Sequence, residues 1–135
     1  MGGLIGTASI EKDGLLPKNM AGYYSGFSSS DFVIEFGNIY ELQSFMVTVY
    51  LNGHFSTYLV NPSLNNHLTY FDIRYIGKGD DISFYAKPND PRVYIKSAAT
   101  VNGRIAIQFL ASRSTFQIRN ESTPSDFTKI EAVKM

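Results

Sequence analysis

The sequence predicts an all-β protein, an antiparallel, jelly-roll-like β-sandwich of about eight or nine short strands. Three observations support this prediction. Apolar and polar residues alternate with a period of two in many short runs, which is typical of strands with one buried face. Turn residues such as Asn-Gly and Pro separate these runs at even intervals. The chain also contains ten Phe and nine Tyr, a composition that favours sheets.

The clearest alternation lies between Arg92 and Arg119, where three short apolar runs follow one another. Their apolar sides consist of Val93 and Ile95, then Ile105, Ile107 and Phe109, then Phe116 and Ile118. Asn102-Gly103 separates the first two runs, and the polar turn 112–114 separates the last two. We expect three consecutive strands in an antiparallel meander that buries one face against a second layer.

The N-terminal part of the chain has no such alternation. Residues 1–30 are rich in Gly and Ser, and the stretch 20–30 is loop-like, with aromatic residues set between Gly and Ser. We therefore expect an irregular lead-in over 1–30 that packs partly on a β-sandwich domain over 31–135. The first strand of this domain covers 32–36 and ends at Gly37.

The strongest local signal is Asn52-Gly53, which joins two alternating runs. Both residue types tolerate positive φ, so the pair favours a two-residue turn and a β-hairpin. In the first run Phe45, Val47, Val49 and Leu51 share one side. In the second, Phe55, Thr57 and Leu59 share one side, and Tyr58 lies on the other.

Turn residues divide the rest of the chain. The stretch 61–66 is predicted to be a polar loop, because Pro62 argues against a continuing strand. Further strands are expected at 71–75 and 82–86, ending at the turns 77–80 and 88–91. A closing strand is expected within 127–133, after the loop 121–126. No segment predicts a helix.

Composition excludes several classes of protein. Twelve Lys and Arg balance twelve Asp and Glu, so no net field attracts nucleic acid or an anionic membrane. The absence of Cys excludes a disulfide framework, a thiolate nucleophile and cysteine-ligated metal. No apolar run approaches the ~18 residues of a membrane span, so we expect no membrane insertion. The N-terminus does not have the pattern of a signal peptide.

The residue patterns of known catalytic sites do not support catalysis. His54 and His67 have no metal-ligand spacing, and we expect exposed side chains beside turns. No Gly-x-Ser-x-Gly elbow occurs. Asp80 and Asp81 could suggest a glycosidase, but adjacent strand residues point to opposite faces, and such aspartates commonly cap turns. A calcium site would need a denser Asp/Asn ladder. We expect no enzyme activity, no metal and no cofactor.

Tyrosine is the remaining candidate for recognition, since its flat ring with a polar tip suits sugar stacking and subunit interfaces. Cross-strand packing within the sheet is the alternative reading, and both stay open at this point. The tyrosines concerned are Tyr23, Tyr24, Tyr50, Tyr58, Tyr70, Tyr85 and Tyr94.

Two segments carry a family resemblance. The segment from Thr7 to Pro17, Thr-Ala-Ser-Ile-Glu-Lys-Asp-Gly-Leu-Leu-Pro, resembles a phrase that often closes the shaft of a bacteriophage tail fibre before its tip. Arg92-Val-Tyr-Ile-Lys96, followed by the stretch 103–110, is similar to a strand pair common in small β-domains of tail proteins. Together they resemble the C-terminal receptor-binding head of phage and prophage tail fibres.

The resemblance implies a homotrimer in the virion that adheres through its distal loops to a bacterial surface glycan or outer-membrane protein. No family binding residue transfers one by one, so loop position and residue type alone select the ligand-binding candidates. These are Tyr58, Asn65, Asn66 and His67 around one polar loop, and Lys78, Asp80, Asn89 and Arg92 around the next two turns. Two alternatives remain: a structural virion component such as a baseplate, collar or decoration protein, and a monomeric carbohydrate-binding or adhesin module on the bacterial cell surface.

Overall fold

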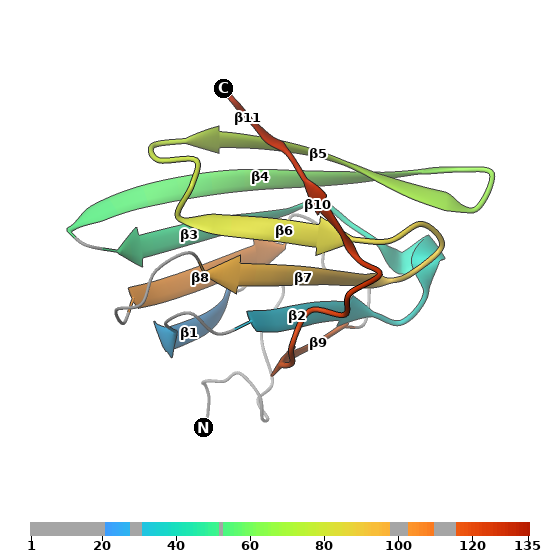
Figure 1. Cartoon of the computed structure of the whole chain (residues 1–135), viewed down its shortest axis with the longest axis horizontal. Helices are drawn as coiled ribbons and strands as arrows, with labels where there is room; N and C mark the ends of the chain where they lie inside the picture. The colour runs from blue at the N-terminus through green and yellow to red at the C-terminus, as the bar shows by residue number, and fades with distance from the viewer. Residues whose placement is uncertain (1–20, 28–30, 52, 98–102, 110–115) are drawn as a thin grey trace.

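The computed structural model describes residues 21–27, 31–51, 53–97, 103–109 and 116–135. Eleven strands in these ranges form two sheets that pack face to face as a β-sandwich (Figure 1). The predicted all-β sandwich is therefore confirmed. The described chain contains one short 3₁₀ turn, η1 (Ile39–Glu41), and within these ranges no helix has the length and apolar character needed to cross a membrane.

The first sheet, sheet A, has six strands. All its neighbours are antiparallel except the last pair, in which β11 runs parallel to β5. In spatial order the strands are β1 (Ala21–Phe27), β8 (Gly103–Phe109), β3 (Phe45–Leu51), β4 (His54–Asn65), β5 (Leu68–Ile76) and β11 (Ala132–Lys134).

The second sheet, sheet B, has five antiparallel strands. In spatial order they are β10 (Thr128–Ile130), β6 (Ile82–Ala86), β7 (Arg92–Ser97), β2 (Asp31–Phe36) and β9 (Phe116–Asn120). The core lies between the two sheets, and its aromatic centre joins Phe36 and Phe45, with 6.3 Å between ring centroids, to Phe109. The period-two alternation of each strand supplies this core from both sheets.

The predicted meander over 92–119 is wrong. Its three strands form, but β7 and β9 belong to sheet B, whereas β8 inserts between β1 and β3 of sheet A. Alternation identifies the face of a strand that is buried, and both sheets of a sandwich offer such a face. The pattern therefore does not indicate which sheet each strand joins.

Two predicted loops are strands. Residues 21–27 form β1, which pairs with β8 at the edge of sheet A, although the division of the chain into domains at residue 30 stays a prediction. Residues 61–65 continue β4, because beyond Val60 the strand has left the end of β3 and pairs with β5 alone. Pro62 lacks a backbone N–H, and a strand with one neighbour tolerates this loss.

The C-terminal segment crosses from one sheet to the other, so the predicted single closing strand over 127–133 is also wrong. Figure 1 shows this segment, residues 121–135, passing from β9 across sheet B to its far edge and then on to sheet A. We call it the C-terminal strap. It adds β10 beside β6 and β11 beside β5, so each short strand completes a different sheet.

The hairpin predicted at Asn52-Gly53 is confirmed by its register. Leu51 pairs with His54, and Gly53 has a φ of +82°, whereas Asn52 lies outside the described residues. Tyr58 lies on the buried side of β4, because it is 0% exposed and its ring lies in the core. Tyr58 pairs with Val47, and directly opposed residues of an antiparallel pair share a face. The predicted turn 112–114, Asn102 and the segment 7–17 lie outside the described ranges.

Candidate functional site

The β4–β5 hairpin ends in a tight turn made of two predicted binding residues. Asn65 pairs with Leu68, and the two residues between them, Asn66 and His67, have φ values of +53° and +66°. Two positive φ values across a two-residue connection are the geometry of a type I′ turn, whose twist matches that of the strands it joins. The turn therefore holds its side chains on a rigid support.

The hairpin projects as a two-stranded ribbon. From the pair Asn61–Asp72 to its turn, it lies beyond β3 on one side and beyond β11 on the other. Figure 1 shows it extending past the other strands at one end of the sandwich. A free two-stranded ribbon is marginally stable in water, so contacts from the body are needed to hold it.

Among the described residues, three polar contacts brace the ribbon. At its base, Ser44 Oγ donates to Asn61 Oδ1 at 2.5 Å. Along β5, Thr69 Oγ1 donates to the carbonyl oxygen of Lys87 at 3.1 Å. At the turn, the hydroxyl of Tyr40 and Nδ1 of His67 lie 2.5 Å apart, and the two rings meet edge to face. The 3₁₀ turn that carries Tyr40 is itself capped, because Asn38 Oδ1 accepts from the Tyr40 N–H at 2.8 Å.

Large side chains are exposed at this braced end. Tyr40 is 65% exposed, Tyr70 is 50% exposed, and Leu64 and Leu68 are also exposed. The polar side chains of the turn stand among them. Leu64 shares one face of the ribbon with its partner Thr69, whereas Leu68 and Tyr70 lie on the opposite face. We call this end of the ribbon, with both of its faces, the hairpin tip, and it consists of Tyr40, Leu64, Asn65, Asn66, His67, Leu68 and Tyr70.

A buried polar cluster lies near the opposite end of β4. Asp81 accepts a hydrogen bond from Ser56 Oγ at 2.7 Å and lies 3.0 Å from His54 Nε2. Ser56 Oγ in turn accepts from the N–H of Lys78 at 3.0 Å, and Tyr58 donates to the carbonyl oxygen of Lys78 at 2.7 Å. The sequence predicted an exposed His54, but His54 is half-buried against this carboxylate.

The cluster holds a loop, and its hydrogen bonds differ from those of a catalytic triad. In a catalytic triad the serine hydroxyl donates to histidine, whereas Ser56 donates its proton to Asp81. The residues it fixes are 77–81, the loop between β5 and β6. Burial raises the pKa of Tyr58 to about 12, which keeps its hydroxyl a donor to this loop.

The loop borders an open cleft of about 640 Å³, which we call the edge cleft. The cleft lies between the loop, the first part of β6, the end of β5 and the C-terminal strap. Its lining joins charges of both signs to apolar surface. The lining residues are Tyr75, Lys78, Gly79, Asp80, Ile82, Ser83, Phe84, Lys129, Ile130, Glu131 and Ala132.

The outer face of sheet B carries the anchor of the strap. Arg92 forms a two-pronged ion pair with Asp90, and its guanidinium lies 4.9 Å from the centre of the Phe127 ring. Tyr94 packs edge to face on Phe127 and donates to Glu121. Burial and this bond raise the pKa of Tyr94 to about 12, and the Tyr94 hydroxyl holds the pKa of Glu121 below its usual value.

The structure therefore distributes the predicted binding residues over separate surfaces. Asn65, Asn66 and His67 come together at the hairpin tip. Lys78 and Asp80 border the edge cleft. Asn89 is exposed in the turn after β6, while Arg92 is held by Asp90 and Phe127. Tyr58 is in the core, so it contributes to no surface.

Comparison with known proteins adds no relative. No protein-family model, curated protein or solved structure matches the chain. Within the described ranges, no three His, Cys, Asp or Glu side chains gather as a metal site.

Sequence reasoning missed several residues of the hairpin tip and of the edge cleft. Tyr40 reaches the hairpin tip from the connection between β2 and β3, and Lys129 and Glu131 reach the edge cleft from the C-terminal strap. The Asn38 cap was a local signal for the turn that presents Tyr40. No local signal places the strap beside the loop 77–81, because that contact depends on the crossing between sheets.

Proposed function

We propose that this chain is a non-enzymatic receptor-binding head of a phage or prophage tail fibre, and that its hairpin tip adheres to a bacterial surface glycan or outer-membrane protein. One observation supports this most directly. A braced ribbon projects from one end of the sandwich and presents Tyr40, Tyr70, Leu64 and Leu68 to solvent. Exposed apolar side chains gathered on a rigid support are typical of binding surfaces.

The chemistry of the tip suits recognition. Tyrosine supplies broad contact area while losing little conformational entropy, since only two side-chain torsions become fixed on binding. Asn65 and Asn66 add amide donors and acceptors that can pair with hydroxyl or peptide groups. The type I′ turn and the contact between Tyr40 and His67 fix the surface before a partner arrives, which lowers the entropic cost of association.

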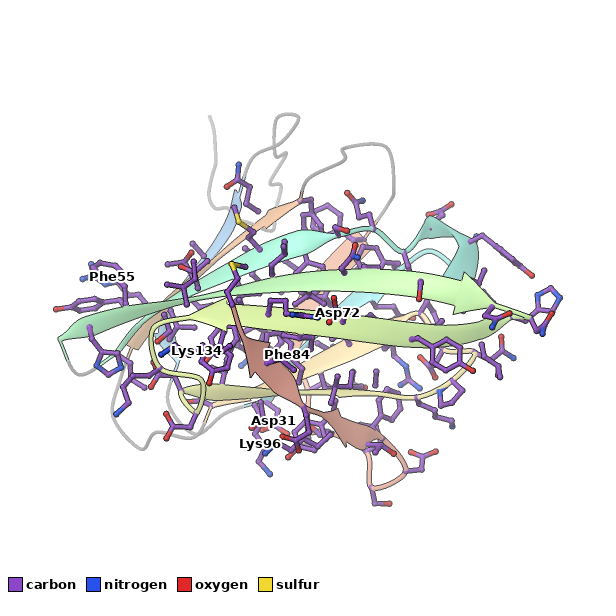
Figure 2. All side chains as sticks on the ribbon, turned by 90° about the horizontal axis from the view of Figure 1, so that it is seen from above. Asp31, Phe55, Asp72, Phe84, Lys96 and Lys134 are labelled. Atoms are coloured by element: carbon purple, nitrogen blue, oxygen red, sulfur yellow. The ribbon has the colours of Figure 1, made fainter. Side chains whose placement is uncertain are left out.

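The proposed head is a homotrimer. At the opposite end of β4 from the tip, the outer face of sheet A carries Phe55, which is 66% exposed, and Ile76, which is 58% exposed (Figure 2). Burial of this face between subunits would remove apolar surface from water and leave the three tips free. Three weak contacts on one particle give an avidity far above that of a single contact.

The test measures retention of the labelled full chain on a panel of Gram-negative bacterial strains. Tyr40→Ala and Tyr70→Ala should each lower the apparent affinity about tenfold or more, as expected for truncated aromatic anchors. His67→Gly should also weaken binding, because it removes the contact with Tyr40 that braces the ribbon, while glycine still accepts the positive φ of this position. Lys96→Ala is the matched control, since Lys96 is exposed on the outer face of sheet B (Figure 2).

Two results would contradict the proposal. Retention that survives both tyrosine substitutions would show that another surface makes the contact. Assembly into larger particles without retention on any strain would favour a structural virion component. Circular dichroism of each variant separates loss of contact from loss of fold.

A further inference from the structure

The edge cleft has the properties of a second binding site, distinct from the hairpin tip. Its volume of about 640 Å³ lies within the ~300–1,000 Å³ range of small-molecule sites. The hairpin tip lies at one end of β5, and the loop 77–81 follows the other end. We propose that the edge cleft binds a neutral saccharide, whichever receptor the hairpin tip contacts.

The charged side chains around the cleft have no partner among the described residues. Lys78 and Asp80 line it from the loop, and Lys129 and Glu131 line it from the strap. Within the described chain, the side chains of these four residues form no hydrogen bond or ion pair with one another or with any other described residue. Their donors and acceptors remain available to a ligand.

The arrangement of these charges favours hydroxyl groups. The loop and the strap each supply one ammonium and one carboxylate, so the lining carries no net charge. A simple anion or cation would meet a repelling group beside each attracting one. A sugar hydroxyl can donate to a carboxylate and accept from an ammonium, so a ring with several hydroxyls satisfies both kinds of group.

The cleft also offers apolar surface for the C–H groups of a sugar ring. Tyr75, Ile130 and Ala132 line it while remaining partly exposed, and the buried core residue Phe84 also borders it. The backbone of Gly79 lies directly against the Tyr75 ring, where an added Cβ would overlap it. The glycine therefore fixes the position of the aromatic ring that borders the cleft.

Both walls of the cleft are preorganised. The polar cluster of His54, Ser56 and Asp81 holds the loop, and Tyr58 binds it from the core. The strap is held by ladder pairing of β10 with β6 and of β11 with β5. A site whose walls need no ordering keeps more of its interaction energy as affinity.

The experiment titrates the full chain with glucose, galactose, N-acetylglucosamine and rhamnose, and follows backbone amide shifts by NMR. At least one sugar should shift the amides of Gly79, Ser83 and Ile130 in a saturable manner. Asp80→Asn and Glu131→Gln should each weaken that sugar about tenfold, because each converts a charged acceptor into a neutral one. Asp72→Asn, on the outer face of sheet A, is the matched control and should change nothing.

Three outcomes would overturn the inference. No saturable shift with any of the four sugars would do so. An equal loss of sugar affinity in Asp72→Asn would show that removing any nearby carboxylate weakens binding. Saturable binding of glycine or acetate, with no binding of sugars, would assign the charged side chains another role. Tyr70→Ala separates this proposal from the proposed function, because it should weaken retention on cells and leave the sugar-induced shifts intact.

Discussion

At the scale of single residues, two buried tyrosine hydroxyls make the fold sensitive to high pH. Tyr58 donates to the loop beside the edge cleft, and Tyr94 donates to Glu121 in the strap. The pKa of each is raised from 10.0 to about 12, in both cases chiefly by burial. Above pH 10 the unfolded chain therefore releases protons that the folded chain keeps, and stability falls as the pH rises towards 12.

Urea denaturation at a series of pH values up to 12 tests this link between the tyrosine pKa values and stability. The wild-type chain should keep a constant unfolding free energy from neutral pH to about pH 10 and lose it steadily towards pH 12. Tyr58→Phe and Tyr94→Phe should each cost about 1 kcal/mol at neutral pH. Each should also make the alkaline decline shallower, since one titrating group is gone. A decline with the same slope in the double variant would contradict the assignment.

Tyr58 also shows what the sequence could have predicted. The alternation over 55–59 indicated a strand, but the set with more apolar residues is not the buried set. Counting across the two-residue turn pairs Leu51 with His54 and Val47 with Tyr58, so the inward face of β3 determines that of β4. The length of the turn therefore indicated which face of β4 is buried, and it is a better guide to that face than the composition of the strand.

At the scale of elements, alternation and turn residues predicted most strands but not their sheets. The path from β7 to β8 to β9 changes sheet twice, and the strap changes sheet once more. These crossings depend on the fit of two whole layers, which no local pattern encodes. For that reason sequence reasoning found the residues of the loop 77–81 but not the strap residues that complete the edge cleft.

Two glycines in different turns provide a matched test of turn geometry. Gly53 and Gly77 both have positive φ, at +82° and +96°. A Cβ at Gly53 would meet open space, whereas one at Gly77 would lie 2.7 Å from the carbonyl oxygen of Phe55. We expect Gly53→Ala to cost about 1–2 kcal/mol from backbone strain alone. Gly77→Ala should cost about 1–3 kcal/mol more, because the β4 backbone must shift.

Thermal or urea denaturation of the two glycine variants gives the comparison directly. The same Gly77→Ala chain should also lose order at the edge cleft, because Gly77 begins the loop that carries Lys78 and Asp80. Equal losses of stability in the two variants would mean that the contact with Phe55 adds nothing to the strain.

At the scale of the whole molecule, the outer face of sheet A is the surface on which a trimeric head and a monomeric module would differ. It would be buried between subunits in the trimer and exposed in the monomer. An uncharged row crosses four strands of this face, formed by Ala106, Thr48, Thr57 and Ile76. Phe55 lies beside this row and packs on Tyr50, with 4.8 Å between ring centroids. A large exposed aromatic side chain beside an uncharged row is a typical centre for association between subunits. Charged side chains, among them Asp72 and Arg74, lie elsewhere on the same face.

Light scattering on a sizing column should give the mass of three chains for the wild type. Phe55→Ser combined with Ile76→Ser should give the mass of one chain, with a circular dichroism spectrum unchanged, because both side chains are exposed in the single subunit. Leu64→Ser at the hairpin tip is the control and should remain a trimer. A wild-type chain with the mass of one subunit would contradict the trimer and favour a monomeric carbohydrate-binding or adhesin module. In a monomer the hairpin tip would lack the avidity of three copies, and the edge cleft would be the stronger candidate for its function.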